Sequence, residues 1–114
     1  MDALQLKICD IQGRLFKLSA QKKYSSATFI KAFMTLGTAK ELDSRYNRMQ
    51  WFSNDVLYWI GYIYRYWHCY NGEDSAKIYK QAPVETMKRN YMMFHTMDPI
   101  LAIEDLKEIH RQKK

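Results

Sequence analysis

The sequence predicts an all-α protein, a compact bundle of six or seven helices around one aromatic-rich central helix. The chain has 114 residues, the length of one domain, so residues 1–114 are expected to form a single helical domain. Only four glycines and two prolines occur, too few for the many turns of an all-β domain. Large apolar residues instead recur at steps of three and four, which is the period of an amphipathic helix. These observations favour helices in every periodic segment.

The first helix is expected from about Asp2 to Ala20. Its large aliphatic residues step by four and three along one helical face: Leu4, Ile8, Ile11, Leu15 and Leu18. Gly13 lies inside this segment, where glycine costs about 1 kcal/mol relative to alanine. The glycine therefore indicates a kink or a close crossing with another helix.

A second helix is expected to start at Ser25 or Ser26, since a serine side chain can cap the free backbone N–H groups of a first turn. Its apolar stripe consists of Phe29, Ile30, Phe33 and Met34. A short third helix is expected to begin at Thr38, because the residues from there have the Ser/Thr-x-x-Glu form of a capping box. Residues 44–53 show no clean period and indicate a loop that holds a large aromatic anchor, Trp51.

The next segment predicts a helix buried at the centre of the bundle. Ser53 or Asn54 is expected to cap it, and Asn71-Gly72 to end it. Five of the nine tyrosines and two of the three tryptophans lie between these ends. One stripe steps by four and three: Val56, Ile60, Ile63 and Trp67. A helix that is apolar almost all round is typical of a core.

Three shorter helices are expected to follow. The first starts at Asp74 or Ser75, and the second has Pro83 at its first helical position. The last begins at Pro99, with Asp98 as its cap. Apolar residues step by three and four along the last two helices: Val84, Met87, Tyr91 and Phe94, then Ile100, Ile103, Leu106 and Ile109.

One strip of the central helix is polar and forms the first candidate site. Gly61, Arg65 and His68 step by four and three, so they share a face. A guanidinium binds carboxylate or phosphate through paired hydrogen bonds, and histidine titrates near neutral pH. The strip therefore predicts an anion pocket or an anchor for a protein partner. The alternative is structural: Arg65 pairs with a buried acid, Asp98 or Glu104, and His68 is a core histidine.

A second candidate site adds the turn before the last helix. The full candidate ligand pocket comprises Gly61, Arg65, His68, His95 and Asp98. If His68, His95 and Asp98 converged, they would form the hydrogen-bonded set that acid–base chemistry requires. The alternative is a capped turn beside an exposed histidine. No known catalytic or phosphate-binding motif occurs, so the chain is not expected to be an enzyme.

Neither a metal nor a cofactor is expected. The two cysteines, Cys9 and Cys69, belong to no CxxC pair, and only three histidines occur. Charges interrupt the N-terminal residues, which indicates no signal peptide. The longest strongly apolar stretch, residues 56–64, is too short to span a membrane. The protein is therefore expected in the reducing cytoplasm.

The positive charge is concentrated in the first half of the chain. Residues 1–50 carry nine Lys or Arg against four Asp or Glu, whereas residues 51–114 carry nine against eight. The basic half predicts contact with nucleic acid or with an acidic protein surface. The alternative is a solvated helix face, since cations are favoured at the end of a helix by its dipole.

Three stretches resemble a family of small bacterial proteins: residues 47–51 (Asn-Arg-Met-Gln-Trp), 59–68 (Trp-Ile-Gly-Tyr-Ile-Tyr-Arg-Tyr-Trp-His) and 94–99 (Phe-His-Thr-Met-Asp-Pro). The resemblance covers most of the chain from about residue 25 onward. Members of this family are commonly labelled antitoxins and tend to be encoded beside toxin-like genes, including ones that resemble ADP-ribosyltransferases. The resemblance implies a helical protein that binds a partner, and it does not imply an enzyme.

The leading hypothesis is an antitoxin that neutralises a toxin, encoded nearby, by direct binding. Tyr, Trp and Arg are enriched at the energetic centres of protein interfaces. The expected contact residues are Arg48, Trp51, Tyr58, Tyr62, Arg65 and His68. Two alternatives stay open: operator binding through the basic N-terminal half, and binding of a small anionic ligand or nucleotide. The oligomeric state is not predicted.

Overall fold

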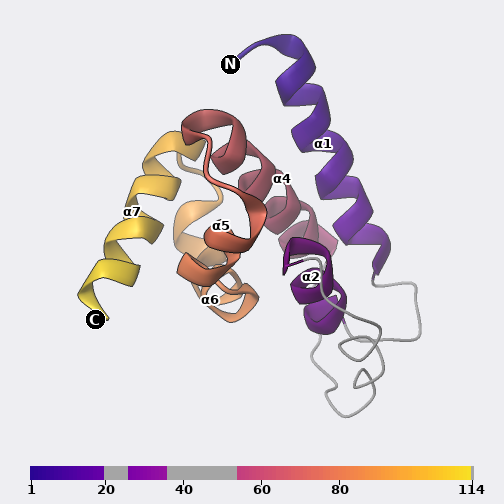
Figure 1. Cartoon of the computed structure of the whole chain (residues 1–114). Helices are drawn as coiled ribbons and strands as arrows, with labels where there is room; N and C mark the ends of the chain where they lie inside the picture. Colours follow the sequence, from indigo (N-terminus) through magenta and orange to yellow (C-terminus); the bar gives the residue numbers. More distant parts are fainter. Residues whose placement is uncertain (20–25, 36–53, 114) are drawn as a thin grey trace.

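The computed structural model describes residues 1–19, 26–35 and 54–113, and within these ranges it contains six α-helices and no strand. The predicted all-α class is therefore confirmed (Figure 1). The helices are α1 (Ala3–Leu18), α2 (Ser26–Thr35), α4 (Asn54–Asn71), α5 (Ser75–Gln81), α6 (Val84–Phe94) and α7 (Pro99–Gln112). The helix predicted from Thr38 and the loop predicted over residues 44–53 lie outside the described residues. None of the described helices is long and apolar enough to cross a membrane.

Helix α4 is the central element, as its aromatic content predicted. It packs against α1, α5, α6 and α7, and Figure 1 shows α1 and α7 on opposite sides of it. Its buried residues are Leu57, Trp59, Ile60, Gly61, Ile63, Tyr64 and Trp67. The predicted end is confirmed too: Gly72 adopts a φ of 80°, which glycine tolerates, and its N–H donates to the carbonyl of His68 at 2.8 Å.

Local capping explains where the other helices begin. Asp2 forms a capping box with Gln5 at the start of α1, and Asp74 accepts a hydrogen bond from the N–H of Lys77 at the start of α5. Asp98 caps α7 as predicted, with a proline in the first turn. Pro83 lies one position earlier than predicted, at the N-cap of α6 and not at its first helical residue.

Two glycines allow α1 and α4 to cross at close range. A Cβ atom on Gly61 would lie 2.6 Å from the carbonyl oxygen of Gln12 and 2.8 Å from the Cα atom of Gly13. A Cβ atom on Gly13 would lie 2.8 Å from the carbonyl oxygen of Tyr58. These distances are too short for any larger residue unless a backbone moves. The glycine inside the first helix therefore marks a close helix crossing.

The side of α1 that packs against the rest of the molecule is not its aliphatic face. The buried residues of α1 are Cys9, Gln12, Gly13 and Phe16. Phe16 makes edge-to-face contacts with Phe29 and Phe33 of α2 and with Tyr64 of α4. This one aromatic side chain therefore joins the first three described helices.

Candidate functional site

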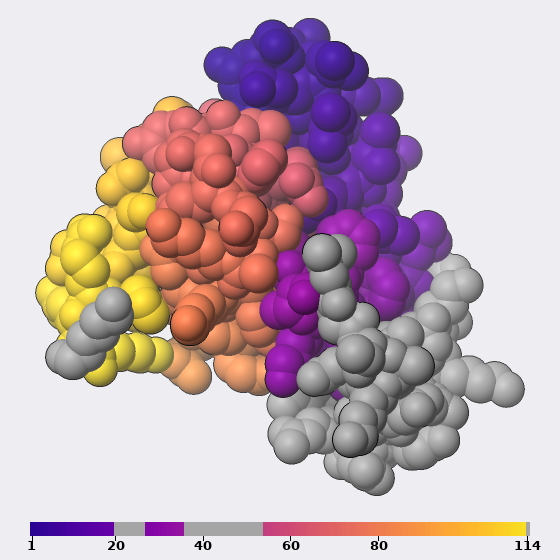
Figure 2. Space-filling view, in the orientation of Figure 1, coloured from indigo at the N-terminus to yellow at the C-terminus, as the bar shows by residue number. Residues whose placement is uncertain are grey.

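The aliphatic face of α1 points away from the helix bundle. We call it the outer face, and it consists of Leu4, Ile8, Ile11, Leu15 and Leu18. Between 37% and 69% of each of these side chains is exposed. Figure 2 shows α1, in indigo, at one edge of the molecule. Five large aliphatic side chains at steps of four and three thus form a continuous apolar stripe on the surface.

Arg65 is held by a buried amide on the neighbouring helix. The Nε of Arg65 donates a hydrogen bond to Oε1 of Gln12 at 2.8 Å. Gln12 in turn donates from Nε2 to the carbonyl oxygen of Gly61 at 3.0 Å, and only 5% of it is exposed. Because both ends of this amide are bonded, it fixes the direction of the guanidinium.

Arg65 has no acidic partner in the described part of the chain. Arg14 and Arg111, by contrast, pair with Asp10 and Glu108. The two acids considered as partners for Arg65 are engaged elsewhere: Asp98 caps α7, and Glu104 accepts a hydrogen bond from Tyr70 at 3.1 Å. The structural alternative of a buried ion pair is therefore not what these residues form.

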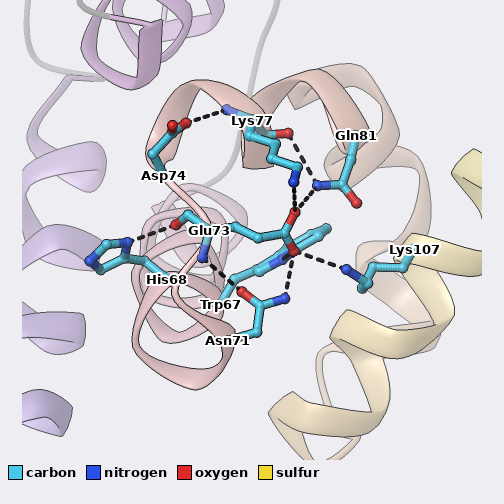
Figure 3. Close-up of polar contacts among 8 residues, drawn as sticks. All are labelled: Trp67, His68, Asn71, Glu73, Asp74, Lys77, Gln81 and Lys107. Atoms are coloured by element: carbon cyan, nitrogen blue, oxygen red, sulfur yellow. Dashed lines mark hydrogen bonds and ion pairs between the residues drawn. The ribbon is translucent and has the colours of Figure 1, made fainter.

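His68 is oriented by the loop that follows α4. Its Nδ1 lies 2.7 Å from the carbonyl oxygen of Glu73 (Figure 3). A carbonyl oxygen can only accept, so Nδ1 carries the hydrogen and Nε2 of the neutral ring is left as an acceptor. The ring is half-buried, and its tautomer is set by the backbone.

Arg65 and His68 line one cavity, which we call the α2–α4–α5 cavity. Its volume is about 820 Å³, within the range of small-molecule sites. Its other walls come from Phe33 and Met34 of α2 and from Ser75 and Ala76 at the start of α5. Asp74, at the N-cap of α5, also lines it, so the cavity combines one guanidinium, one imidazole and one carboxylate with a largely apolar wall.

His95 lies at a different cavity. This second cavity, of about 360 Å³, is lined by Tyr58 and Tyr62 of α4 together with Tyr91 and His95 of α6 and its end. The imidazole of His95 stacks on Tyr91 with ring centres 4.3 Å apart, and its Nδ1 lies 2.8 Å from the Tyr91 carbonyl oxygen. His95 thus packs against its own helix and does not share the cavity of His68.

The predicted polar strip is divided by α1. Gly61 is covered by the backbone of Gln12 and Gly13, so it is the seat of a helix crossing and leaves no notch for a ligand. Of the five predicted pocket residues, Arg65 and His68 line the α2–α4–α5 cavity, His95 lines the second cavity, and Asp98 lines neither of these two.

The six predicted contact residues also have different surroundings. Tyr58 donates a hydrogen bond to Asp10 of α1. Burial, together with this bond, raises the pKa of the Tyr58 phenol to about 12, so the hydroxyl stays a donor. Tyr62 is half-buried beside the second cavity. Arg48 and Trp51 lie outside the described residues.

The two cysteines meet at the α1–α4 contact. Burial raises the pKa of the Cys9 thiol to about 11, and the neighbouring Cys69 thiol adds to this shift. Cys9 is therefore a protonated, poorly nucleophilic group at neutral pH. Within the described residues, no group of three or more His, Cys, Asp or Glu side chains could hold a metal ion.

Glu73 is the most heavily bonded carboxylate in the described residues, and sequence reasoning missed it. Its oxygens accept hydrogen bonds from Trp67 and Lys107 at 2.9 Å each, from Gln81 at 2.6 Å and from Asn71 at 2.5 Å (Figure 3). Burial by itself would raise the pKa of Glu73, but these hydrogen bonds outweigh it and lower the pKa to about 2. Glu73 thus ties α4, α5 and α7 together.

Comparison of the chain with protein-family models, with curated proteins and with solved structures gives no match.

Proposed function

We propose that this chain is a protein-binding module that acts as the antitoxin of a toxin–antitoxin pair, and that it docks its partner on the outer face of α1. The observation that carries the proposal is the exposure of this face, which the chain's own fold leaves uncovered in the described residues. Large apolar patches on a surface mark interaction sites, because covering them removes apolar area from water. The antitoxin role itself is supported by the family resemblance of residues 47–51, 59–68 and 94–99.

The spacing of the outer face suits a helical partner. Steps of four and three repeat over two heptads, the arrangement in which one helix inserts its side chains between those of another. At a rise of about 1.5 Å per residue, the stripe from Leu4 to Leu18 is about 21 Å long. Because α1 is already folded against α4, a partner helix would not have to supply the free energy for ordering it.

The charge beside the outer face favours an acidic partner. Lys7 and Arg14 lie along one edge of the stripe and are exposed, with Arg14 also paired to Asp10, and the whole chain carries a net charge of +6. Two copies of α1 packed antiparallel would bring these cations together, which is unfavourable. An amphipathic helix with Asp or Glu along its edge would instead be attracted.

The test is co-purification of the chain with the product of the neighbouring toxin gene, followed by calorimetric titration. Ile11→Asp places a charge in the middle of the outer face, where 55% of the side chain is exposed, so the fold should tolerate it. We expect this variant to bind at least 100-fold more weakly. The matched control is Leu101→Asp on α7, where 58% of the side chain is exposed, and it should bind like the parent chain.

Two outcomes would contradict the proposal. Either the chain and the toxin migrate separately at micromolar concentration, or Ile11→Asp binds as tightly as the control. Sedimentation of the chain alone distinguishes self-association from toxin binding. If the chain is a dimer and Ile11→Asp makes it monomeric, the outer face joins two copies of the chain and the toxin does not dock there.

A further inference from the structure

We infer that the α2–α4–α5 cavity is a binding site for a small organic carboxylate, with Arg65 as its anchor. This goes beyond the proposed docking of a partner, because the cavity and the outer face of α1 share no residues. The inference rests on a guanidinium that is held in place but forms no ion pair with an acidic side chain of the described residues.

The first step of the argument is the state of Arg65. The side chain is half-buried, and its one hydrogen bond to a described residue runs from Nε to the neutral amide of Gln12. A charge removed from water needs a counter-charge or other polar partners. The terminal nitrogens of the guanidinium form no bond to a described residue, so they are available for the paired hydrogen bonds that a carboxylate accepts.

The second step is preorganisation. Gln12 is buried and bonded at both ends, so it holds the guanidinium without consuming the terminal nitrogens. His68 is held in the same way, through Nδ1 and the carbonyl oxygen of Glu73. Figure 3 shows His68 on the far side of the loop from the Glu73 carboxylate, towards the purple ribbons of the N-terminal helices. Its Nε2 is therefore placed to accept a hydrogen bond from a hydroxyl or N–H group of the ligand.

The third step sets the class of ligand. Phe33 and Met34 give the cavity an apolar wall, which suits an organic body rather than a free inorganic ion. Asp74 also lines the cavity, and its carboxylate would repel a doubly charged phosphate more strongly than a singly charged carboxylate. A small carboxylate with an aromatic or aliphatic body fits these conditions.

The test uses three probes on the whole ¹⁵N-labelled chain: benzoate, its neutral counterpart benzyl alcohol, and inorganic phosphate. We expect benzoate to shift the Nε–H resonance of Arg65 and the backbone amides of Phe33 and Ala76, with a dissociation constant of about 1 mM for a fragment of this size. Benzyl alcohol should bind at least tenfold more weakly, and phosphate should bind more weakly than benzoate.

Variants locate the site. Arg65→Gln should weaken benzoate binding at least tenfold, and Arg65→Lys should weaken it less, because the lysine keeps the charge and loses the paired geometry. The matched control is Arg89→Gln on the exposed side of α6, which should not change binding. The amide spectrum of each variant reports whether it is folded before its affinity is compared.

The inference is overturned if benzoate and benzyl alcohol bind equally, if phosphate binds more tightly than benzoate, or if no probe shifts these resonances at 20 mM. It is also overturned if folded Arg65→Gln or Arg65→Lys binds benzoate as well as the parent chain. Because Ile11→Asp should leave benzoate binding unchanged, failure of this site and failure of toxin docking would be seen separately.

Discussion

At the scale of single residues, Glu73 links α5 and α7 to α4 through hydrogen bonds and an ion pair. The side chain is 11% exposed and accepts hydrogen bonds from residues of α4, α5 and α7. A carboxylate in such surroundings is stabilised only while it is charged, since the donors that compensate for its burial bind the ionised form. The stability of the fold should therefore depend on the ionisation of this one group.

Replacing Glu73 by glutamine tests this dependence. The pKa of Glu73 is about 2 in the folded chain against an ordinary 4.5, so its contribution is fully present above pH 4.5 and is lost as the pH falls towards 2. Glu73→Gln should lower the free energy of unfolding at pH 7 by about 2–3 kcal/mol. The free energy of unfolding of this variant should also decrease less than that of the parent chain between pH 4.5 and pH 2. Urea unfolding at several pH values measures both. Glu85→Gln, at an exposed position, is the control. If the two variants show the same dependence of stability on pH, Glu73 does not have this stabilising role.

Cys9 gives a second test at this scale. Its side chain is 0% exposed, and burial raises the pKa of its thiol to about 11. In a Cys69→Ser variant the remaining thiol should therefore react with a disulfide reagent at pH 8 at least 100-fold more slowly than in urea. Cys9→Ser, which keeps the half-buried Cys69, should react faster. Rapid labelling of folded Cys69→Ser would show that α1 does not remain packed against α4.

At the scale of helices, the α1–α4 crossing depends on the absence of two side chains. Alanine is normally preferred over glycine inside a helix by about 1 kcal/mol. At Gly61, however, a Cβ atom would meet the backbone of Gln12 at 2.6 Å, and a backbone cannot turn aside as a flexible side chain can. The preference of a helix for alanine and the close contact between α1 and α4 therefore oppose each other at this position. The contact has the larger effect, so glycine is the residue that fits.

Gly61→Ala should accordingly destabilise the chain by about 1–3 kcal/mol, the usual cost of overpacking. It should also weaken benzoate binding, since Gln12, which orients Arg65, sits at the displaced contact. Thermal and urea unfolding measure the first effect. Arg89→Ala, on an exposed position of α6, is the control and should be nearly neutral. A Gly61→Ala variant that is more stable than the parent chain would mean that the helices do not cross this closely.

At the scale of the whole molecule, the basic charge and the apolar outer face predict different responses to salt. An apolar contact should weaken by less than about threefold between 50 and 200 mM NaCl, whereas six to ten phosphate contacts would lose about 10³–10⁵ in affinity. Titration of the chain with the proposed toxin partner and with DNA from the promoter of its own gene compares the two responses. Tight DNA binding with the steep salt dependence would favour the operator-binding alternative. Five of the nine basic residues in the first half of the chain, on which that alternative depends, lie outside the described residues.

The sequence by itself determined which described segments are helices and, to within about two residues, where they begin and end. These properties are local: Asp2, Asp74 and Asp98 cap helices by bonding to backbone groups two or three residues away. The central position of α4 was also readable, because a helix that is apolar on nearly every side has no stable place except a core.

The tertiary structure alone decided which faces meet. In α1 the aliphatic stripe indicated the helix but not its packing, since close contact of Gly13 with Gly61 placed the opposite side against α4. The same crossing covers Gly61, and the position of α6 places His95 at a different cavity from Arg65 and His68. Glu73 comes directly after the turn residues that end α4, and nothing in the local sequence distinguishes it from an acid on the surface. Its partner Lys107 is 34 residues away in the sequence. Such contacts depend on the distance between backbones in space, which the order of residues along one helix does not contain.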